Sequence, residues 1–116
     1  MELTELTCHA MELRERFAAV EIARSGRPWS RAELAQGFVG DVGDLMKLVM
    51  AKDGRRPGPV DLDARLAHEL ADCLWSVLVL AKVCDVDLER AFLTTLDELT
   101  ATLAPVVTPG KVSRHT

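Results

Sequence analysis

The sequence has few cysteines, and their spacing matches no disulfide or metal-binding pattern. Cys8, Cys73 and Cys84 are an odd number of thiols, and no two of them form a Cys-x-x-Cys pair. This excludes a disulfide framework and indicates thiols buried in a protein of a reducing compartment. It also gives little support to a zinc site built from these cysteines and His9.

The chain also lacks an excess of positive charge and a long apolar run. Lysine and arginine total 14 against 18 acidic residues, for a net charge of −4, so no overall basic field exists to hold a nucleic-acid polymer. A small phosphorylated ligand held through a metal remains compatible with this charge. The longest apolar run, 73–81, is interrupted by Ser76 and is about half of the roughly 20 residues that a membrane span requires. Residues 1–5 are acidic and lack the apolar core of a signal peptide. We therefore expect a soluble, cytoplasmic protein with no membrane partner.

What the chain does contain is helical periodicity. Its 116 residues, 48% of them apolar, suffice for one folded domain but not for two. Apolar residues recur at helical spacing in four segments, 3–24, 31–52, 62–84 and 87–103. We expect an all-α domain over residues 1–104, an antiparallel helical bundle of four main helices, followed by a mobile C-terminal tail over 105–116.

Local signals mark where these helices begin and end. Gly26 and Pro28 end the first, and Ser30 with Glu33 three residues later forms a capping box for the second. The segment 53–60 contains two glycines and two prolines and is expected to be a loop. Asp61 or Asp63 then caps the third helix, and Pro105 stops the fourth.

Two features indicate contacts beyond a simple bundle. The segment 62–84 is apolar on nearly every side, so a chain this short cannot enclose it alone, and we expect a homodimer or a higher homo-oligomer. Gly37, Gly40 and Gly43 repeat at intervals of three in the second helix. This spacing suggests a narrow strip where another backbone or a ligand comes close, although a merely weak or kinked helix would also explain it.

Two acidic pairs interrupt the apolar helices. Asp41 and Asp44 lie three residues apart in the second helix, and Glu69 and Asp72 lie three apart in the third. Each pair therefore shares one helix face, and an antiparallel hairpin would bring the two faces together. One such pair alone is usually a solvated face, but four facing carboxylates need a cation between them. No histidine follows any of these acids by three residues, which argues against a di-iron bundle and favours Mg²⁺, or Mn²⁺, on all-oxygen ligands.

The same residues carry a family resemblance. The run Val39-Gly40-Asp41-Val42-Gly43-Asp44-Leu45, followed by Glu69-Leu70-Ala71-Asp72-Cys73-Leu74-Trp75, resembles the MazG-like all-α nucleoside triphosphate pyrophosphohydrolases. Their signature is Glu-x-x-Glu, a variable gap, then Glu-x-x-Asp. Trp29 stands where the dCTP-pyrophosphatase-like members carry a tryptophan, and 85–92 resembles the start of the family's last helix. The resemblance covers about residues 10–95.

The resemblance implies a Mg²⁺-dependent enzyme that cleaves a (d)NTP to (d)NMP and pyrophosphate, clearing surplus or non-standard nucleotides. Asp41, Asp44, Glu69 and Asp72 would be the metal ligands and catalytic carboxylates. Two departures leave an alternative open, because the first pair is aspartate instead of glutamate and the last helix lacks the family's lysine and asparagine. A catalytically weak or inactive nucleotide-binding or interaction module is that alternative.

Four further residues are candidates for substrate binding. Lys52, Arg55 and Arg56 could meet phosphate oxygens, although Lys52 could equally be a solvated cation at a helix C-terminus. Trp29 could stack on a nucleobase or could be a hydrophobic staple at the entry of its helix. Trp75 is expected in an oligomer core.

Overall fold

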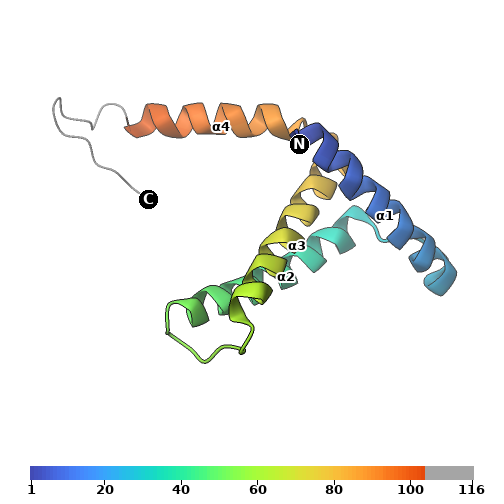
Figure 1. The fold of residues 1–116 in the computed structure, drawn as a ribbon. Coiled ribbons are helices and arrows are strands. Elements are labelled where there is room, and N and C mark those ends of the chain that lie inside the picture. The colour runs from blue at the N-terminus through green and yellow to red at the C-terminus, as the bar shows by residue number, and fades with distance from the viewer. Residues whose placement is uncertain (104–116) are drawn as a thin grey trace. The chain divides into compact units, whose positions relative to one another are not determined.

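The computed structural model describes residues 1–103, which are all-helical and contain no strand. The helices are α1 (Leu3–Ser25), α2 (Arg31–Lys52), α3 (Leu62–Val83) and α4 (Leu88–Leu103), as Figure 1 shows. The all-α prediction and the four helical segments are therefore confirmed. The expected tail over 105–116, with Pro105, lies outside the described residues.

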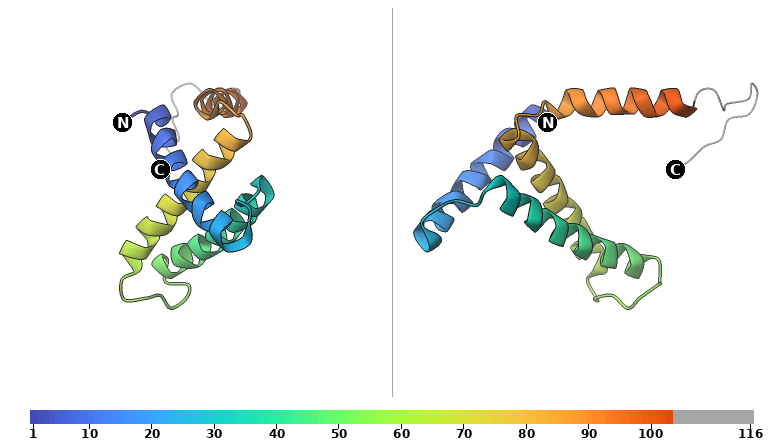
Figure 2. Two further views of the ribbon diagram at one scale, coloured as in Figure 1. Left: turned by 90° about the vertical axis from the view of Figure 1, so that its right-hand side faces the viewer. Right: turned by 180° about the vertical axis from the view of Figure 1, so that it is seen from behind.

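The chain divides into two compact units, Met1–Val86 and a second that begins at Asp87. In the first unit, α2 and α3 form a hairpin and α1 packs against α3, as the two views of Figure 2 show. The most deeply buried apolar side chains are few and come from all three helices: Ala10, Leu34, Leu78 and Val79. The prediction of a single four-helix bundle over 1–104 stays a prediction.

Trp75 of α3 connects α3 to α1. Its indole Nε1 donates a hydrogen bond to the carbonyl oxygen of Ala10 at 3.2 Å, and its ring meets Phe17 edge to face with centroids 5.9 Å apart. A partly buried tryptophan needs such a partner for its N–H. Trp75 is thus part of the contact between two helices of one chain, while its predicted place in an oligomer core stays a prediction.

The helix ends follow the local signals. Gly26 closes α1 in the left-handed conformation, with φ 86°, and its N–H donates to the Ile22 carbonyl. Ser30 and Glu33 form the reciprocal capping box at the start of α2. Asp61 precedes α3, but its side chain makes no capping hydrogen bond, because it accepts one from Arg65 Nε at 3.0 Å instead.

Of the three glycines in α2, Gly37 has a close neighbour. A Cβ built on Gly37 would lie 3.4 Å from Cζ3 of Trp29, whereas one on Gly40 or Gly43 would meet nothing within 4 Å among residues 1–103. Within this chain the expected close approach therefore occurs at Gly37, and the approaching group is a side chain and not a backbone. A ligand or a second chain at the other two glycines stays a prediction.

The fourth helix is amphipathic and begins with a side-chain cap, since the Asp87 carboxylate accepts a hydrogen bond from the Arg90 N–H at 3.2 Å. Its apolar stripe consists of Leu88, Phe92, Leu96, Leu99 and Leu103. None of the helices over residues 1–103 has the length and apolar character to cross a membrane.

Candidate metal and nucleotide site

Three of the four predicted carboxylates converge. Asp41 comes from α2, and Glu69 and Asp72 come from successive turns of one face of α3. One carboxylate oxygen from each lies within 4.8 Å of the others, and all three residues are half-buried. The α2–α3 hairpin therefore creates a shared acidic cluster, made of Asp41, Glu69 and Asp72.

The acidic cluster is electrostatically unfavourable without a cation. The pKa of Asp41 is raised from its ordinary value first by burial, then by the charges of Asp72 and Asp44. Burial, followed by Asp72 and Asp41, raises the pKa of Glu69 in the same way. The Oε2 atom of Glu69 is inaccessible to solvent and has no hydrogen-bond partner among the described residues. A hard cation on oxygen ligands would relieve both conditions, so these residues fit Mg²⁺ or Mn²⁺.

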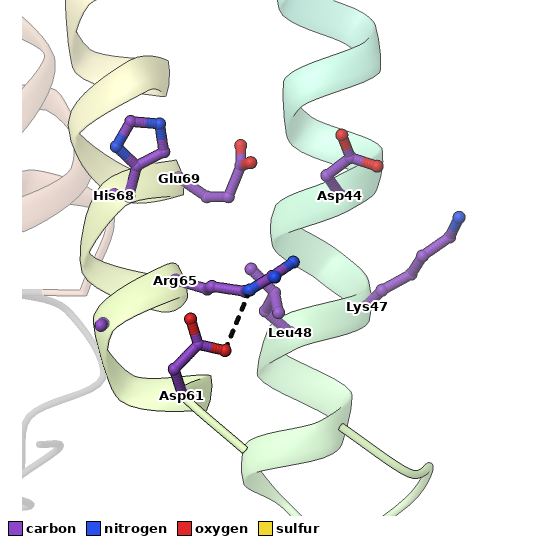
Figure 3. A pocket seen from close by; sticks show the side chains of 8 residues that line it. Asp44, Lys47, Leu48, Asp61, Arg65, His68 and Glu69 are labelled. Carbon is purple, nitrogen blue, oxygen red and sulfur yellow. Dashed lines mark hydrogen bonds and ion pairs between the residues drawn. The ribbon is translucent and has the colours of Figure 1, made fainter. Parts of the chain in front are cut away.

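Asp44, the fourth predicted ligand, does not belong to the group of three. It is exposed and lies opposite Glu69 in a neighbouring cavity of about 620 Å³. In Figure 3 the Glu69 side chain points from α3 toward α2, and Asp44 stands on α2. Residues three apart on a helix differ by about 60° in direction, so Asp41 and Asp44 need not project to the same point.

The neighbouring cavity contains two cations that the sequence analysis did not select. Lys47 and Arg65 line it together with Asp44, Asp61 and Glu69. Figure 3 shows Arg65 extending from α3 toward α2, with its Nε bonded to Asp61. Among the described residues, no acidic oxygen lies within 4.0 Å of the Lys47 amine. The spacing of these cations, three residues after Asp44 and four before Glu69, is the signal that could have revealed them.

His68 and Cys73 also adjoin the acidic cluster. His68 Nε2 is 3.2 Å from Asp72 Oδ2, a helical i,i+4 contact that a search for histidines three residues after an acid does not detect. Burial, and then the charges of Asp41 and the other two carboxylates, raises the pKa of the Cys73 thiol. Cys73 therefore stays a neutral thiol, which is a poor ligand for a hard cation.

A second cavity, of about 690 Å³, extends from the acidic cluster toward Trp29. Asp41, a member of the acidic cluster, lines this cavity, and Phe17, Trp29 and Trp75 supply aromatic surface. The Trp29 side chain remains partly accessible, at 44% exposure for the residue. The volume of this second cavity and its mixture of aromatic and charged lining residues are typical of small-molecule sites.

The remaining predicted phosphate contacts lie elsewhere. Lys52 Nζ pairs with Asp63 Oδ1 at 2.6 Å, and Arg55 and Arg56 are exposed in the loop after α2. None of the three lines either cavity. Their role in binding phosphate stays a prediction.

Comparison with known proteins gives one partial similarity. Over 68 residues the chain is 38% identical to a protein named dCTP pyrophosphatase 1 from Rattus norvegicus. The similarity covers 55% of this chain and 40% of that relative, so the chain spans well under half of the relative's length. No family model matches the chain, and no solved structure matches it.

Proposed function

We propose that the protein is a Mg²⁺-dependent nucleoside triphosphate pyrophosphohydrolase that releases pyrophosphate from a (d)NTP. The observation that carries the proposal is the convergence of Asp41, Glu69 and Asp72 within 4.8 Å from two helices. The partial similarity to a protein named dCTP pyrophosphatase 1 supports the same reaction.

Asp41, Glu69 and Asp72 would hold the metal, with Asp44 as a further ligand or as a contact to the substrate side. The donor set is all oxygen, and Glu69 Oε2 lacks any other partner among the described residues. When bound, Mg²⁺ would neutralise the charge of the triphosphate and stabilise the charge that develops in the transition state. The cluster's carboxylates also supply the bases that orient and deprotonate an attacking water.

The two cavities suggest how a nucleotide lies. The phosphates would occupy the neighbouring cavity, which Lys47 and Arg65 line together with Asp44 and Glu69. The base would enter the second cavity and stack on Trp29, since Asp41 borders the cavity that Trp29 lines. In this arrangement Lys47 and Arg65 would contact phosphate in place of the lysine and asparagine that the last helix lacks.

The direct test is pyrophosphate release from a panel of NTPs and dNTPs, beginning with dCTP, with Mg²⁺ supplied. We expect turnover that disappears on chelation of the metal and in Glu69→Gln, which removes one charge and preserves shape. Glu15→Gln, at an exposed position of α1, is the matched control and should keep wild-type activity. Absence of turnover across the whole panel contradicts the enzyme assignment.

One observation favours a second candidate function, a catalytically silent nucleotide-binding module. Asp44 lies outside the group of three carboxylates, and aspartate reaches one methylene less far than the glutamate of the resembled signature. Calorimetric binding of a nucleotide without hydrolysis would support this candidate. Turnover gained in Asp44→Glu would show that the short side chain is what limits the enzyme.

A further inference from the structure

Two charged side chains of α1 hold both backbone polar groups of Trp29. Arg14 Nη2 donates a hydrogen bond to the Trp29 carbonyl oxygen at 2.8 Å. The Trp29 N–H donates to Glu21 Oε1 at 2.7 Å, and Arg14 Nη1 lies 3.5 Å from the same oxygen. Because positions 14 and 21 are seven apart, two turns of α1 bring them to one face. The pair Arg14 and Glu21 therefore forms a clamp on the peptide groups of one residue.

Because the Arg14–Glu21 pair is largely buried, the cost of desolvating its charges offsets much of the stability that it could add. The Arg14 and Glu21 side chains are 10% and 17% exposed, and Arg14 Nε is buried with no partner among the described residues. A buried ion pair of this kind commonly contributes no more stability than an apolar pair of similar volume. What the clamp does supply is a defined position for Trp29.

That position is defined relative to the acidic cluster. The indole lies against Gly37, where a Cβ would be 3.4 Å from its Cζ3 atom, and Gly37 is one helical turn before Asp41. Arg14, Glu21, Trp29, Gly37 and Asp41 all line the same cavity of about 690 Å³. The clamp on one side and α2 on the other thus set the position of the aromatic ring relative to Asp41.

We propose that Arg14 and Glu21 are positioning residues for nucleobase recognition, acting through Trp29. The inference rests on the proposed function, in which the phosphates lie at the acidic cluster and the base stacks on the indole. Neither residue needs to touch the nucleotide, because each bonds the Trp29 backbone. Removing the clamp frees the indole and weakens binding of the base, while the metal and phosphate site is left intact.

The test is the double replacement Arg14→Met/Glu21→Leu, which substitutes an apolar pair for the buried ion pair. We expect the KM for dCTP to rise roughly tenfold, the order associated with loss of base stacking on an aromatic ring, with kcat within about twofold of wild type. The Kd of inorganic triphosphate with Mg²⁺, measured by calorimetry, stays unchanged because this probe has no base. Glu15→Leu/Arg16→Met, at exposed positions of the same helix, is the matched control and leaves both quantities unchanged.

A mutant cycle distinguishes positioning from a general structural effect. Trp29→Ala should raise the KM by a similar factor, and adding the double replacement to Trp29→Ala should raise it no further. A wild-type KM in the folded double variant, or a full effect that persists without Trp29, overturns the inference.

If the double variant does not fold, Glu21→Gln keeps the acceptor for the Trp29 N–H but loses the charge facing Arg14. In Glu21→Gln a rise in KM of less than tenfold supports the proposal, and a wild-type KM overturns it. A wild-type protein that neither binds nor hydrolyses nucleotides overturns the proposed function itself.

Discussion

At the scale of single residues, Asp41, Glu69 and Asp72 place like charges within 4.8 Å of one another. Without metal, Glu69→Gln removes one of these charges, and we expect it to stabilise the fold by on the order of 1 kcal/mol. With Mg²⁺ we expect wild type to be the more stable of the two. An ion that binds only the folded state raises the melting temperature by mass action, and Glu69→Gln lacks one of the carboxylates that would bind it. Melting curves of wild type and variant, in chelator and in Mg²⁺, measure both signs. Equal melting temperatures under the two conditions for wild type would contradict a metal site.

The raised pKa values of Asp41 and Glu69 make a related prediction about pH. Their ordinary values are 3.8 and 4.5, and in the metal-free fold both lie higher. Such groups favour the folded state below the unfolded-state pKa, and this contribution is lost as the pH rises through the raised values. In metal-free protein we therefore expect the contribution of Asp41 and Glu69 to stability to fall as the pH rises from their ordinary pKa values through the raised ones, and Asp41→Asn to remove part of this fall relative to wild type. Stabilisation by Mg²⁺ should grow with pH over the same range, because protons compete with the metal. Thermal melts across the acidic range, with and without chelator, follow both trends.

The sequence brings four acids to two facing helices, but it could not show that Asp41, Glu69 and Asp72 converge without Asp44, nor which cations lie beside them. The i,i+3 spacing of Glu69 and Asp72 on a helix is enough to place them on one face. Whether Asp41 or Asp44 meets them depends on the rotation of α2 against α3, which is set by side-chain packing along the whole hairpin. Lys47 and Arg65 lie three and four residues from Asp44 and Glu69 on their own helices, a spacing that places them on the acidic faces, but which of the chain's cations line a shared cavity depends on the same packing.

At the scale of helices, the entry to α2 combines three local interactions. Ser30 caps the helix, the Ser30 N–H donates a hydrogen bond to the Glu33 carboxylate, and Arg27 pairs with Glu33. The side-chain hydrogen bond donated by Arg27, followed by the one donated by the Ser30 N–H, lowers the pKa of Glu33 to about 2. Ser30→Ala should cost about 1 kcal/mol in the free energy of unfolding, and Ser30→Asp should retain most of it. Urea denaturation measures both, and an Ala variant as stable as wild type would contradict the capping assignment.

Helix ends were the part of the fold most open to prediction, because their causes are local. Gly26 and the Ser30–Glu33 box act within a few residues, and the structure places α1 and α2 accordingly. Asp61 shows the limit of such signals. Its carboxylate had two local partners available, a backbone N–H of α3 and the Arg65 side chain, and composition does not decide between them.

At the scale of the whole molecule, each unit taken by itself carries apolar side chains that it does not cover. In the first unit Val42, Met46 and Leu74 are exposed, and α4 carries an apolar stripe along one face. Exposed apolar side chains of this kind commonly mark association sites when they form a continuous surface. We propose that the chain is a homodimer or a higher homo-oligomer, as the all-round apolarity of α3 also predicts.

The stripe of α4 offers the sharpest test of assembly. Leu88, Phe92, Leu96, Leu99 and Leu103 recur every three or four residues along it. Leu96→Glu puts a charge at the middle of this stripe, where burying it in an interface would be costly. Thr94→Glu adds the same charge about 160° around the helix and serves as the matched control. Sedimentation equilibrium should give an oligomer for wild type and for Thr94→Glu, and a lower mass for Leu96→Glu. A wild-type protein that sediments as a monomer at high concentration would show that the exposed faces do not bind a second copy.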